Sequence, residues 1–193
     1  MQLSQEELKI IRDVDFLLTK ISAIDKIAKL FETTRTHLEL VVREPGSFCP
    51  PESILKEGKI SKGENYRNLP YLVLDYPAFF SKDDIFAFRT MFWWGHFFSF
   101  TLHLQGKYLA MFRGSIIDKL DTFNHQGTYV SVGDTPWEYH YAPDNYARIN
   151  QIDARQIAEV GFLKISKKID LDQWSLVPEL AKHFFISCLG GLE

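Results

Sequence analysis

Residues 85–104 constrain the fold of this chain more than any other stretch, because most of them are apolar and many are aromatic. The stretch contains eight Phe or Trp residues. Full burial of one large apolar side chain contributes roughly 1.5–3 kcal/mol, so eight contribute on the order of 12–24 kcal/mol. That equals or exceeds the net stability of a typical domain, about 5–15 kcal/mol. The stretch therefore has to be covered by the rest of the fold, by a partner or by a ligand.

The same stretch predicts a β-hairpin that turns at Gly95 and His96. A two-residue type II′ turn favours glycine at its first central position, and this register pairs Trp94 with Phe97 and Trp93 with Phe98. One face is then expected to pack in the core and, apart from Arg89, carries only apolar residues: Ile85, Ala87, Met91, Trp93, Phe98, Phe100, Leu102 and Leu104. The opposite face mixes aromatic rings with hydroxyl groups and an imidazole: Phe86, Phe88, Thr90, Phe92, Trp94, Phe97, Ser99, Thr101 and His103. A change of register by one residue would move Arg89 to the mixed face.

The length of the chain allows one substantial core, and its composition is that of an ordinary globular protein. We predict a single domain over residues 1–193, made of a helical segment (1–43), a long connection with Pro and Gly (44–70) and an α+β body (71–193). The formal net charge of −3 provides no attraction to nucleic acid or to an anionic membrane. No signal peptide or membrane span is expected, so the predicted location is the cytoplasm.

Neither a metal ion nor a cofactor is expected. Cys49 and Cys188 are the only cysteines, which is too few for a zinc set or a disulfide framework. The six histidines form no H-x-H, H-x-x-x-H or H-E-x-x-H pattern, and no phosphate-binding glycine motif follows a predicted strand. The expected partners are a small-molecule ligand or a second copy of the chain, and neither nucleic acid nor a membrane.

Residues 1–43 are expected to be helical. Ser4 and Glu7 have the spacing of a capping box. Apolar residues then recur every three or four positions and mark one helix face: Leu8, Ile11, Val14, Leu18, Ile21, Ile24, Ala28 and Phe31. Ser22, followed by Asp25, could start a second helix, so one long helix and two shorter ones both fit.

Strands and helices alternate after the connection. Besides the hairpin, strands are expected over residues 71–76 (ending at Pro77), 128–132, 137–141 and 162–171. Helices are expected over residues 107–123, from Asp144 to Val160, and from Ser175 to Gly190-Gly191. Short turns between strands favour antiparallel pairing. The predicted fold class is therefore α+β, with a mainly antiparallel sheet of about five to six strands packed against helices and a helical N-terminal segment.

The mixed face of the hairpin is the predicted ligand site, because ligand pockets are mostly apolar with a few polar groups that orient the ligand. The predicted ligand-binding residues are Phe88, Arg89, Thr90, Phe92, Trp94, Ser99, Thr101, His103, Trp137 and His140. Two packing alternatives stay open, in which the N-terminal helices or a second copy of the chain cover this face. For Arg89, a structural ion pair with Asp75 is favoured over the binding of an anion.

The predicted function is a binding or interaction module, present as a homo-oligomer, that uses an aromatic-lined sheet face or cleft. The alternative is a small-molecule enzyme whose acid and base residues lie in the same cleft and come from His103, His140, Glu138 and Arg89. This alternative requires at least two of the four side chains to converge around one cavity. No catalytic residue is assigned from the sequence.

Overall fold

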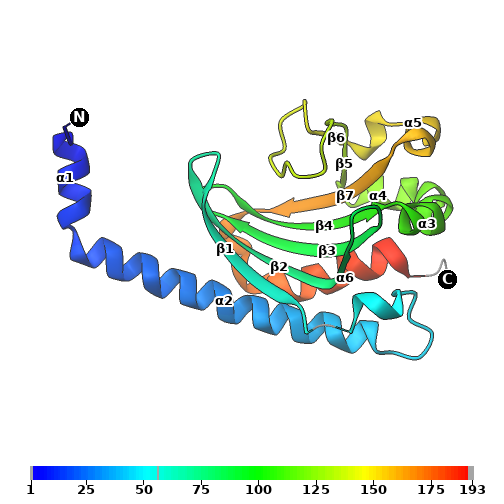
Figure 1. Ribbon diagram of the computed structural model, residues 1–193, viewed down its shortest axis with the longest axis horizontal. Coiled ribbons are helices and arrows are strands. Elements are labelled where there is room, and N and C mark those ends of the chain that lie inside the picture. The colour runs from blue at the N-terminus through cyan, green and yellow to red at the C-terminus, as the bar shows by residue number, and fades with distance from the viewer. Residues whose placement is uncertain (1, 56, 191–193) are drawn as a thin grey trace.

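The computed structural model describes residues 2–55 and 57–190, and within them seven antiparallel strands form one sheet in the order β1-β2-β3-β4-β7-β5-β6 (Figure 1). The strands are β1 (Lys59–Tyr66), β2 (Leu69–Phe80), β3 (Ile85–Trp93), β4 (Phe97–Gln105), β5 (Tyr129–Ser131), β6 (Tyr146–Arg148) and β7 (Phe162–Ile169). The α-helices are α1 (Gln5–Arg12), α2 (Val14–Val42), α3 (Lys107–Asp118), α4 (Leu120–His125), α5 (Ala154–Glu159) and α6 (Val177–Leu189). The predicted α+β class is confirmed, with slightly more strands than expected.

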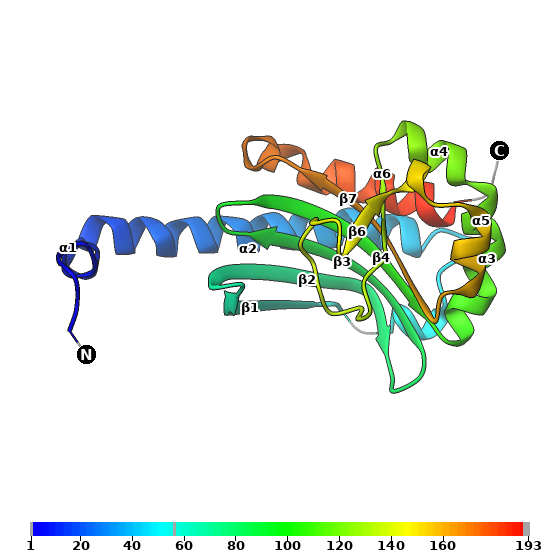
Figure 2. The same cartoon turned by 90° about the horizontal axis from the view of Figure 1, so that it is seen from above.

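Helices cover only one face of the sheet. In Figure 1, α2 and α6 lie on one side of the strands, and the segment 132–145, between β5 and β6, lies on the other. Phe88 of β3 packs in the helical layer, with its ring centroid 5.0 Å from that of Phe185 and 6.3 Å from that of Phe184. A smaller apolar cluster occupies the helix-free face and contains Val73, Met91, Trp93 and Phe97. Figure 2 shows the segment 132–145 crossing this second face.

The N-terminal segment is helical as predicted, and the Ser4–Glu7 capping box is present. The helix is interrupted at Asp13, whose side chain caps α2 by accepting a hydrogen bond from the Phe16 backbone N–H (2.8 Å). The C-terminal half of α2 packs against the sheet and α6, and its buried apolar residues are Ile27, Leu30, Phe31, Leu38 and Val42. Residues 3–21 project beyond the rest of the fold (Figure 1). The predicted apolar face is therefore packed only from Ile24 onward.

The hairpin of β3 and β4 is present, but its predicted register is wrong by one residue. Trp93, and not Trp94, lies opposite Phe97. The turn therefore has three residues, with Gly95 at a φ of +70° and the His96 ring stacked on Trp93 (3.7 Å between centroids).

Burial explains this register. It brings the apolar residues of both strands onto the helix-covered face, where Phe86, Phe88, Phe92, Phe98, Phe100, Leu102 and Leu104 lie. Arg89, Ser99, Thr101 and His103 come together on the opposite face. The predicted register would have placed Phe88 and Phe92 beside these polar groups, so it would have buried less apolar surface for the same number of strand hydrogen bonds.

The connection 44–70 contains a strand that the sequence analysis missed. β1 pairs with β2, and the chain turns between them at Arg67 and Asn68, which both have positive φ (48° and 66°). Such conformations are typical of tight hairpin turns, where glycine is the usual signal. β2 also continues past Pro77, because the pairing with β3 shifts between Asp75 and Ala78 and so accommodates a residue without an N–H.

Three predictions for residues 107–160 are corrected. The expected helix 107–123 divides at Lys119, whose amine donates to the Cys188 carbonyl oxygen (3.3 Å). Residues 137–141 are irregular and belong to the segment 132–145. The expected helix from Asp144 is replaced by β6, a 3₁₀ helix (Ile149–Gln151) and α5, because Asp153 and Gln156 form the capping box that starts α5.

The remaining elements agree with the sequence analysis. β5 and β7 occupy the strands expected at 128–132 and 162–171. The final helix begins at Val177, after a 3₁₀ helix (Leu171–Leu176). It ends next to Gly190, as expected, and Gly191 lies outside the described residues.

Candidate functional site

A groove of about 960 Å³ lies on the helix-free face of the sheet. Strands β1, β2 and β3 form its floor, and Ser61, Val73 and Met91 are among the side chains that line it. Trp137 and Tyr139 of the segment 132–145 form one wall. The volume is at the upper end of the range for small-molecule sites, roughly 300–1,000 Å³.

Large apolar side chains at the edge of the groove contact solvent. Leu55 is 80% exposed, Trp137 51% and Phe80 44%. Single exposed apolar residues are normal on a protein surface, but a cluster around a concave surface is typical of binding sites. A molecule in the groove would therefore remove apolar surface from water.

Two tyrosines fix one end of the groove. Tyr71 lies opposite Gly63 of the edge strand β1, and a Cβ added at Gly63 would be 2.5 Å from the Tyr71 ring. That distance is a steric clash, so only glycine allows the ring to lie across β1. The Tyr66 ring packs edge-on against Tyr71, with 6.2 Å between centroids.

Asp75 and Arg89 place an ion pair in the floor of the groove. Arg89 donates from Nε to Asp75 Oδ1 (2.7 Å) and from its NH2 group to Oδ2 (2.8 Å), and it also donates to the Tyr139 hydroxyl. Burial alone would lower the pKa of Arg89, but the hydrogen bonds and the charge of Asp75 outweigh burial and raise this pKa above its ordinary value. The predicted ion pair is confirmed, and its charges cancel.

Two buried basic side chains lie next to Arg89, beneath the segment 132–145. His103 and Lys164 are opposite each other on β4 and β7. Burial, followed by the charges of Lys164 and Arg89, lowers the pKa of His103 to about 3, so its imidazole is neutral at pH 7. Burial and the charge of Arg89 lower the pKa of Lys164 to about 7. The Lys164 amine donates to the Glu138 carbonyl oxygen and lies 4.8 Å from the centroid of the Tyr139 ring.

Hydroxyl groups occupy the next positions on this face. Thr101 Oγ1 and Ser166 Oγ are 2.7 Å apart. Ser166 also bonds to the Tyr141 hydroxyl and donates to the Phe100 carbonyl oxygen (3.1 Å). Since Tyr141 belongs to the segment 132–145, this network holds the segment on the sheet and leaves Thr101 covered.

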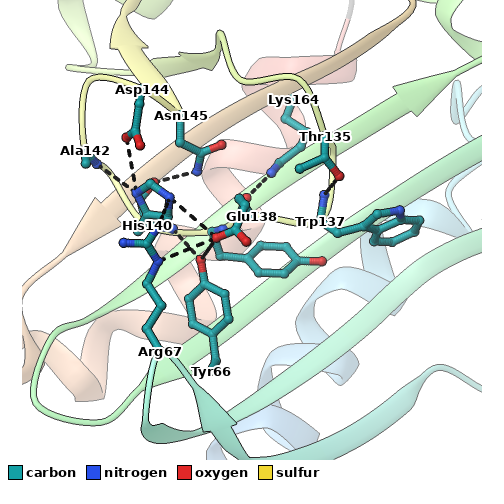
Figure 3. Close-up of polar contacts among 11 residues, drawn as sticks. Tyr66, Arg67, Thr135, Trp137, Glu138, His140, Ala142, Asp144, Asn145 and Lys164 are labelled. Atoms are coloured by element: carbon teal, nitrogen blue, oxygen red, sulfur yellow. Dashed lines mark hydrogen bonds and ion pairs between the residues drawn. The ribbon is translucent and has the colours of Figure 1, made fainter.

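A second set of polar contacts holds the segment 132–145 against the turn between β1 and β2 (Figure 3). We call its four residues Tyr66, Arg67, Glu138 and His140 the tether. The Tyr66 hydroxyl accepts hydrogen bonds from the backbone N–H groups of Tyr139 (2.7 Å) and His140 (3.0 Å), and it donates to Glu138 Oε2 (2.8 Å). Burial raises the pKa of Tyr66 to about 12. One hydroxyl thus fixes three groups of the segment 132–145.

His140 forms the other half of the tether. Its Nε2 atom lies 2.7 Å from the Arg67 guanidinium and 3.4 Å from Glu138 Oε2, and its Nδ1 atom accepts from the Ala142 N–H (3.3 Å). Burial, and then the charge of Arg67, lowers the pKa of His140. Glu138 and His140 therefore come together, but neither belongs to the lining of the groove.

No two of the four side chains named for the enzyme alternative line the groove together. Glu138 and His140 lie in the tether, whereas Arg89 lines the groove. Arg89 and His103 share only a cavity of about 10 Å³, which has room for no more than a water molecule.

The ten predicted ligand-binding residues separate into three groups. Arg89 and Trp137 line the groove. Ser99, Thr101, His103 and His140 are buried on the side covered by the segment 132–145. Phe88, Thr90 and Phe92 are buried on the helix-covered face, and Trp94 packs beside Phe92 in the turn. The expected shared face of Phe88 and His103 is therefore wrong, because the register differs by one residue.

Several groove residues were missed by the sequence analysis. Tyr66 lies in the segment expected to be an irregular connection. Tyr71 and Val73 alternate with Leu72 and Leu74, so their common face was visible in the sequence, but nothing there showed that it faces a groove. Tyr139 lies two positions after Trp137, on the same face of the strand predicted over residues 137–141. Because Trp137 was a predicted site residue, this shared face could have identified Tyr139 as well.

The chain matches no protein-family model, none of the curated proteins and none of the solved structures with which it was compared. Within residues 2–55 and 57–190, no group of three or more His, Cys, Asp or Glu side chains is arranged to hold a metal ion. Of the helices described, none has both the length and the hydropathy needed to cross a membrane. Functional inference therefore depends on the groove itself.

Proposed function

We propose that this protein is a binding module that holds a small, mostly apolar and uncharged molecule in the groove on the helix-free face of its sheet. The observation that carries the proposal is the groove of about 960 Å³ with a mainly aromatic and aliphatic lining. Pockets of this size, with few polar groups, are the usual sites for small molecules.

Most charges that line the groove are already paired, which favours an uncharged ligand. Arg89 is neutralised by Asp75, and Glu52 forms an ion pair with Lys107 (2.9 Å), so a charged ligand would have to compete within these pairs at a desolvation cost. Lys59 also lines the groove, at its exposed edge on β1. A guanidinium has five N–H groups, and three of those on Arg89 are used by Asp75 and Tyr139. The others can donate to a carbonyl or hydroxyl oxygen. We therefore expect a ligand with an apolar, ring-containing body and an oxygen acceptor above Arg89.

A fragment screen by ligand-observed NMR would test this proposal. The screen compares uncharged aromatic fragments with aromatic carboxylates and ammonium ions, on the wild-type chain and on Ser61→Phe. Ser61 lies on the edge strand and lines the groove, so a phenyl ring there fills part of the ligand space. Uncharged fragments should bind best, and Ser61→Phe should weaken their binding by at least about tenfold, equal to roughly 1.4 kcal/mol.

Lys62→Phe is the matched control, because successive residues of a strand point to opposite faces. This variant adds the same ring to β1 on the side away from the groove and should bind like the wild type. The proposal would be overturned by unchanged binding to Ser61→Phe, or by a screen in which only charged fragments bind. Thermal unfolding of both variants would establish that they are folded.

The contact between Glu138 and His140 is the one observation that favours the enzyme alternative. If the protein is an enzyme, Glu138→Gln should abolish turnover of a fragment identified in the screen, and the fragment should still bind. A cytoplasmic location also belongs to this proposal, on the sequence arguments given above, and fractionation of cells that express the full chain would test it.

A further inference from the structure

An apolar surface on the projecting N-terminal residues is not used by the groove or by the core. We call residues 3–21, which comprise α1 and the first part of α2, the arm. Figures 1 and 2 show the arm extending away from the sheet and from the other helices. Eight large apolar side chains of the arm are exposed, each by 42% or more: Leu3, Ile10, Ile11, Val14, Phe16, Leu17, Leu18 and Ile21. Monomeric proteins rarely expose an apolar surface of this size.

The spacing of these residues is that of a helix that pairs with another helix. Val14, Ile21 and Ala28 are seven residues apart, and Leu17, Ile24 and Phe31 form the second such series. Together they give the alternating three- and four-residue spacing of a coiled-coil seam. Ile24 and Ala28 already pack against the core of the same chain, where Phe31 is completely buried. The exposed part of the seam is therefore the continuation of a surface that packs in the described fold.

The charges on the arm change sign in blocks along its length. Glu6 and Glu7 are followed by Lys9 and Arg12, then by Asp13 and Asp15, and finally by Lys20, which also contacts Glu64 of β1 (3.2 Å). A second arm that runs in the opposite direction, centred near Asp13, would place Glu6 beside Lys20 of the first arm and Arg12 beside its Asp13 and Asp15. Membrane-surface helices instead concentrate Lys and Arg on their polar face, whereas this arm carries four acidic and three basic residues. The charge order thus favours a second copy of the chain over a lipid surface.

The exposed area is also sufficient for a dimer. Phe16 lies roughly 200° around the helix from Val14 and so outside the seam. The other seven side chains, each about half exposed, offer on the order of 700 Å² of surface, which approaches the roughly 800 Å² that each partner buries in a stable protein interface. We propose that the arm binds the arm of a second copy of this chain in an antiparallel, two-fold symmetric dimer. The apolar residues of the two arms then cover each other, and a two-fold axis makes the acidic-to-basic contact twice.

The test is the mass of the full chain in solution, measured by light scattering and sedimentation over a dilution series. The wild type should have twice the chain mass of 22.5 kDa. Leu17→Glu combined with Ile21→Glu should raise the dimer dissociation constant by at least about 100-fold, since each change places a charge in the apolar centre of the proposed interface. Both residues are exposed in the single chain, so the variant should fold.

Leu40→Glu is the matched control, because Leu40 is an exposed leucine (66%) on the same helix but outside the arm. This variant should remain dimeric. Reversing charge with Glu6→Lys or with Lys20→Glu should weaken the dimer at low salt, and the two changes together should restore it. Restoration supports the antiparallel order, and its absence overturns that order.

Two other outcomes would overturn the proposal. One is a wild-type chain that stays monomeric throughout the dilution series. The other is a dimer that Leu17→Glu with Ile21→Glu leaves intact. Co-sedimentation with anionic phosphatidylserine vesicles tests whether the arm binds lipid instead of a second chain. A chain that is monomeric and binds vesicles through the arm would assign the apolar surface of the arm to lipid.

Discussion

Asp75 and Arg89 lie directly opposite each other on β2 and β3, and two hydrogen bonds of 2.7 and 2.8 Å join their side chains. Removing one member leaves the other charge largely buried. Asp75→Asn should therefore destabilise the protein by about 3 kcal/mol, whereas the double change Asp75→Leu with Arg89→Met should be close to neutral. Urea unfolding of the wild type, of Asp75→Asn and of the double variant checks this. If the double variant is as unstable as Asp75→Asn, the Asp75–Arg89 pair adds to the free energy of unfolding beyond the neutralisation of one charge by the other.

Lys164 should make the stability of the protein depend on pH in the alkaline range. Its pKa is about 7 in the folded chain and 10.5 ordinarily, so between these values the unfolded chain binds more protons and stability rises with pH. From pH 7 to pH 9 the wild type should gain about 2 kcal/mol relative to Lys164→Met. Urea unfolding at the two pH values provides the measurement.

The exposed Lys168 is the control for this experiment, because it lies on the same strand and face. Lys168→Met should keep the rise in stability that Lys164→Met loses. An equal rise in all three proteins would show that folding does not lower the pKa of Lys164.

Tyr66→Phe should loosen the wall of the groove. The change removes the acceptor for the N–H groups of Tyr139 and His140, and an unsatisfied buried polar group costs roughly 1–3 kcal/mol. Hydrogen exchange at these two amides should become faster, and binding of the uncharged fragments should weaken. Tyr71→Phe removes a hydroxyl from the same groove that has no partner among the described residues, so it should change neither property. Protection of the two amides that survives in Tyr66→Phe would contradict the assignment of the tether.

His103 should make the protein sensitive to acid. Its pKa is lowered from 6.5 to about 3 by burial and by the charges of Lys164 and Arg89, so the unfolded chain binds more protons below pH 6.5 and stability falls as the pH falls. By pH 5 this residue should account for a loss of about 2 kcal/mol.

His103→Leu should lack that loss. Its stability at pH 7 should be similar to or higher than that of the wild type, because Nε2 of His103 is buried with no hydrogen-bond partner among the described residues. Acid unfolding followed by circular dichroism compares the two chains. If the wild type and His103→Leu lose stability equally as the pH falls, protonation of the His103 imidazole does not destabilise the folded chain.

Local signals in the sequence were sufficient for several elements. The Ser4–Glu7 box predicts the start of α1 because its hydrogen bonds join residues three positions apart. Alternation of apolar residues predicts β7, and the adjacency of β2 and β3 predicts the Asp75–Arg89 pair. In each case the interaction that decides the structure lies within one element or between neighbours in sequence.

The missed features depend on contacts that are distant in sequence or on competing turns. Gly95 suits both a two-residue and a three-residue turn, and the choice is made by burial against α6, whose residues follow about 90 positions later. β1 gives no apolar signal, because it is an edge strand with Lys59, Lys62 and Glu64 in contact with solvent. The tether joins residues more than 70 positions apart, so no pattern in either segment could reveal it.

The close approach of Tyr71 to Gly63 has a consequence for the shape of the groove. The phenol ring occupies the space that any side chain at position 63 would need. Even a single methyl group there would force the ring to move, because the added carbon would lie 2.5 Å from it. The shape of this end of the groove therefore depends on Gly63, a residue that does not itself line the groove.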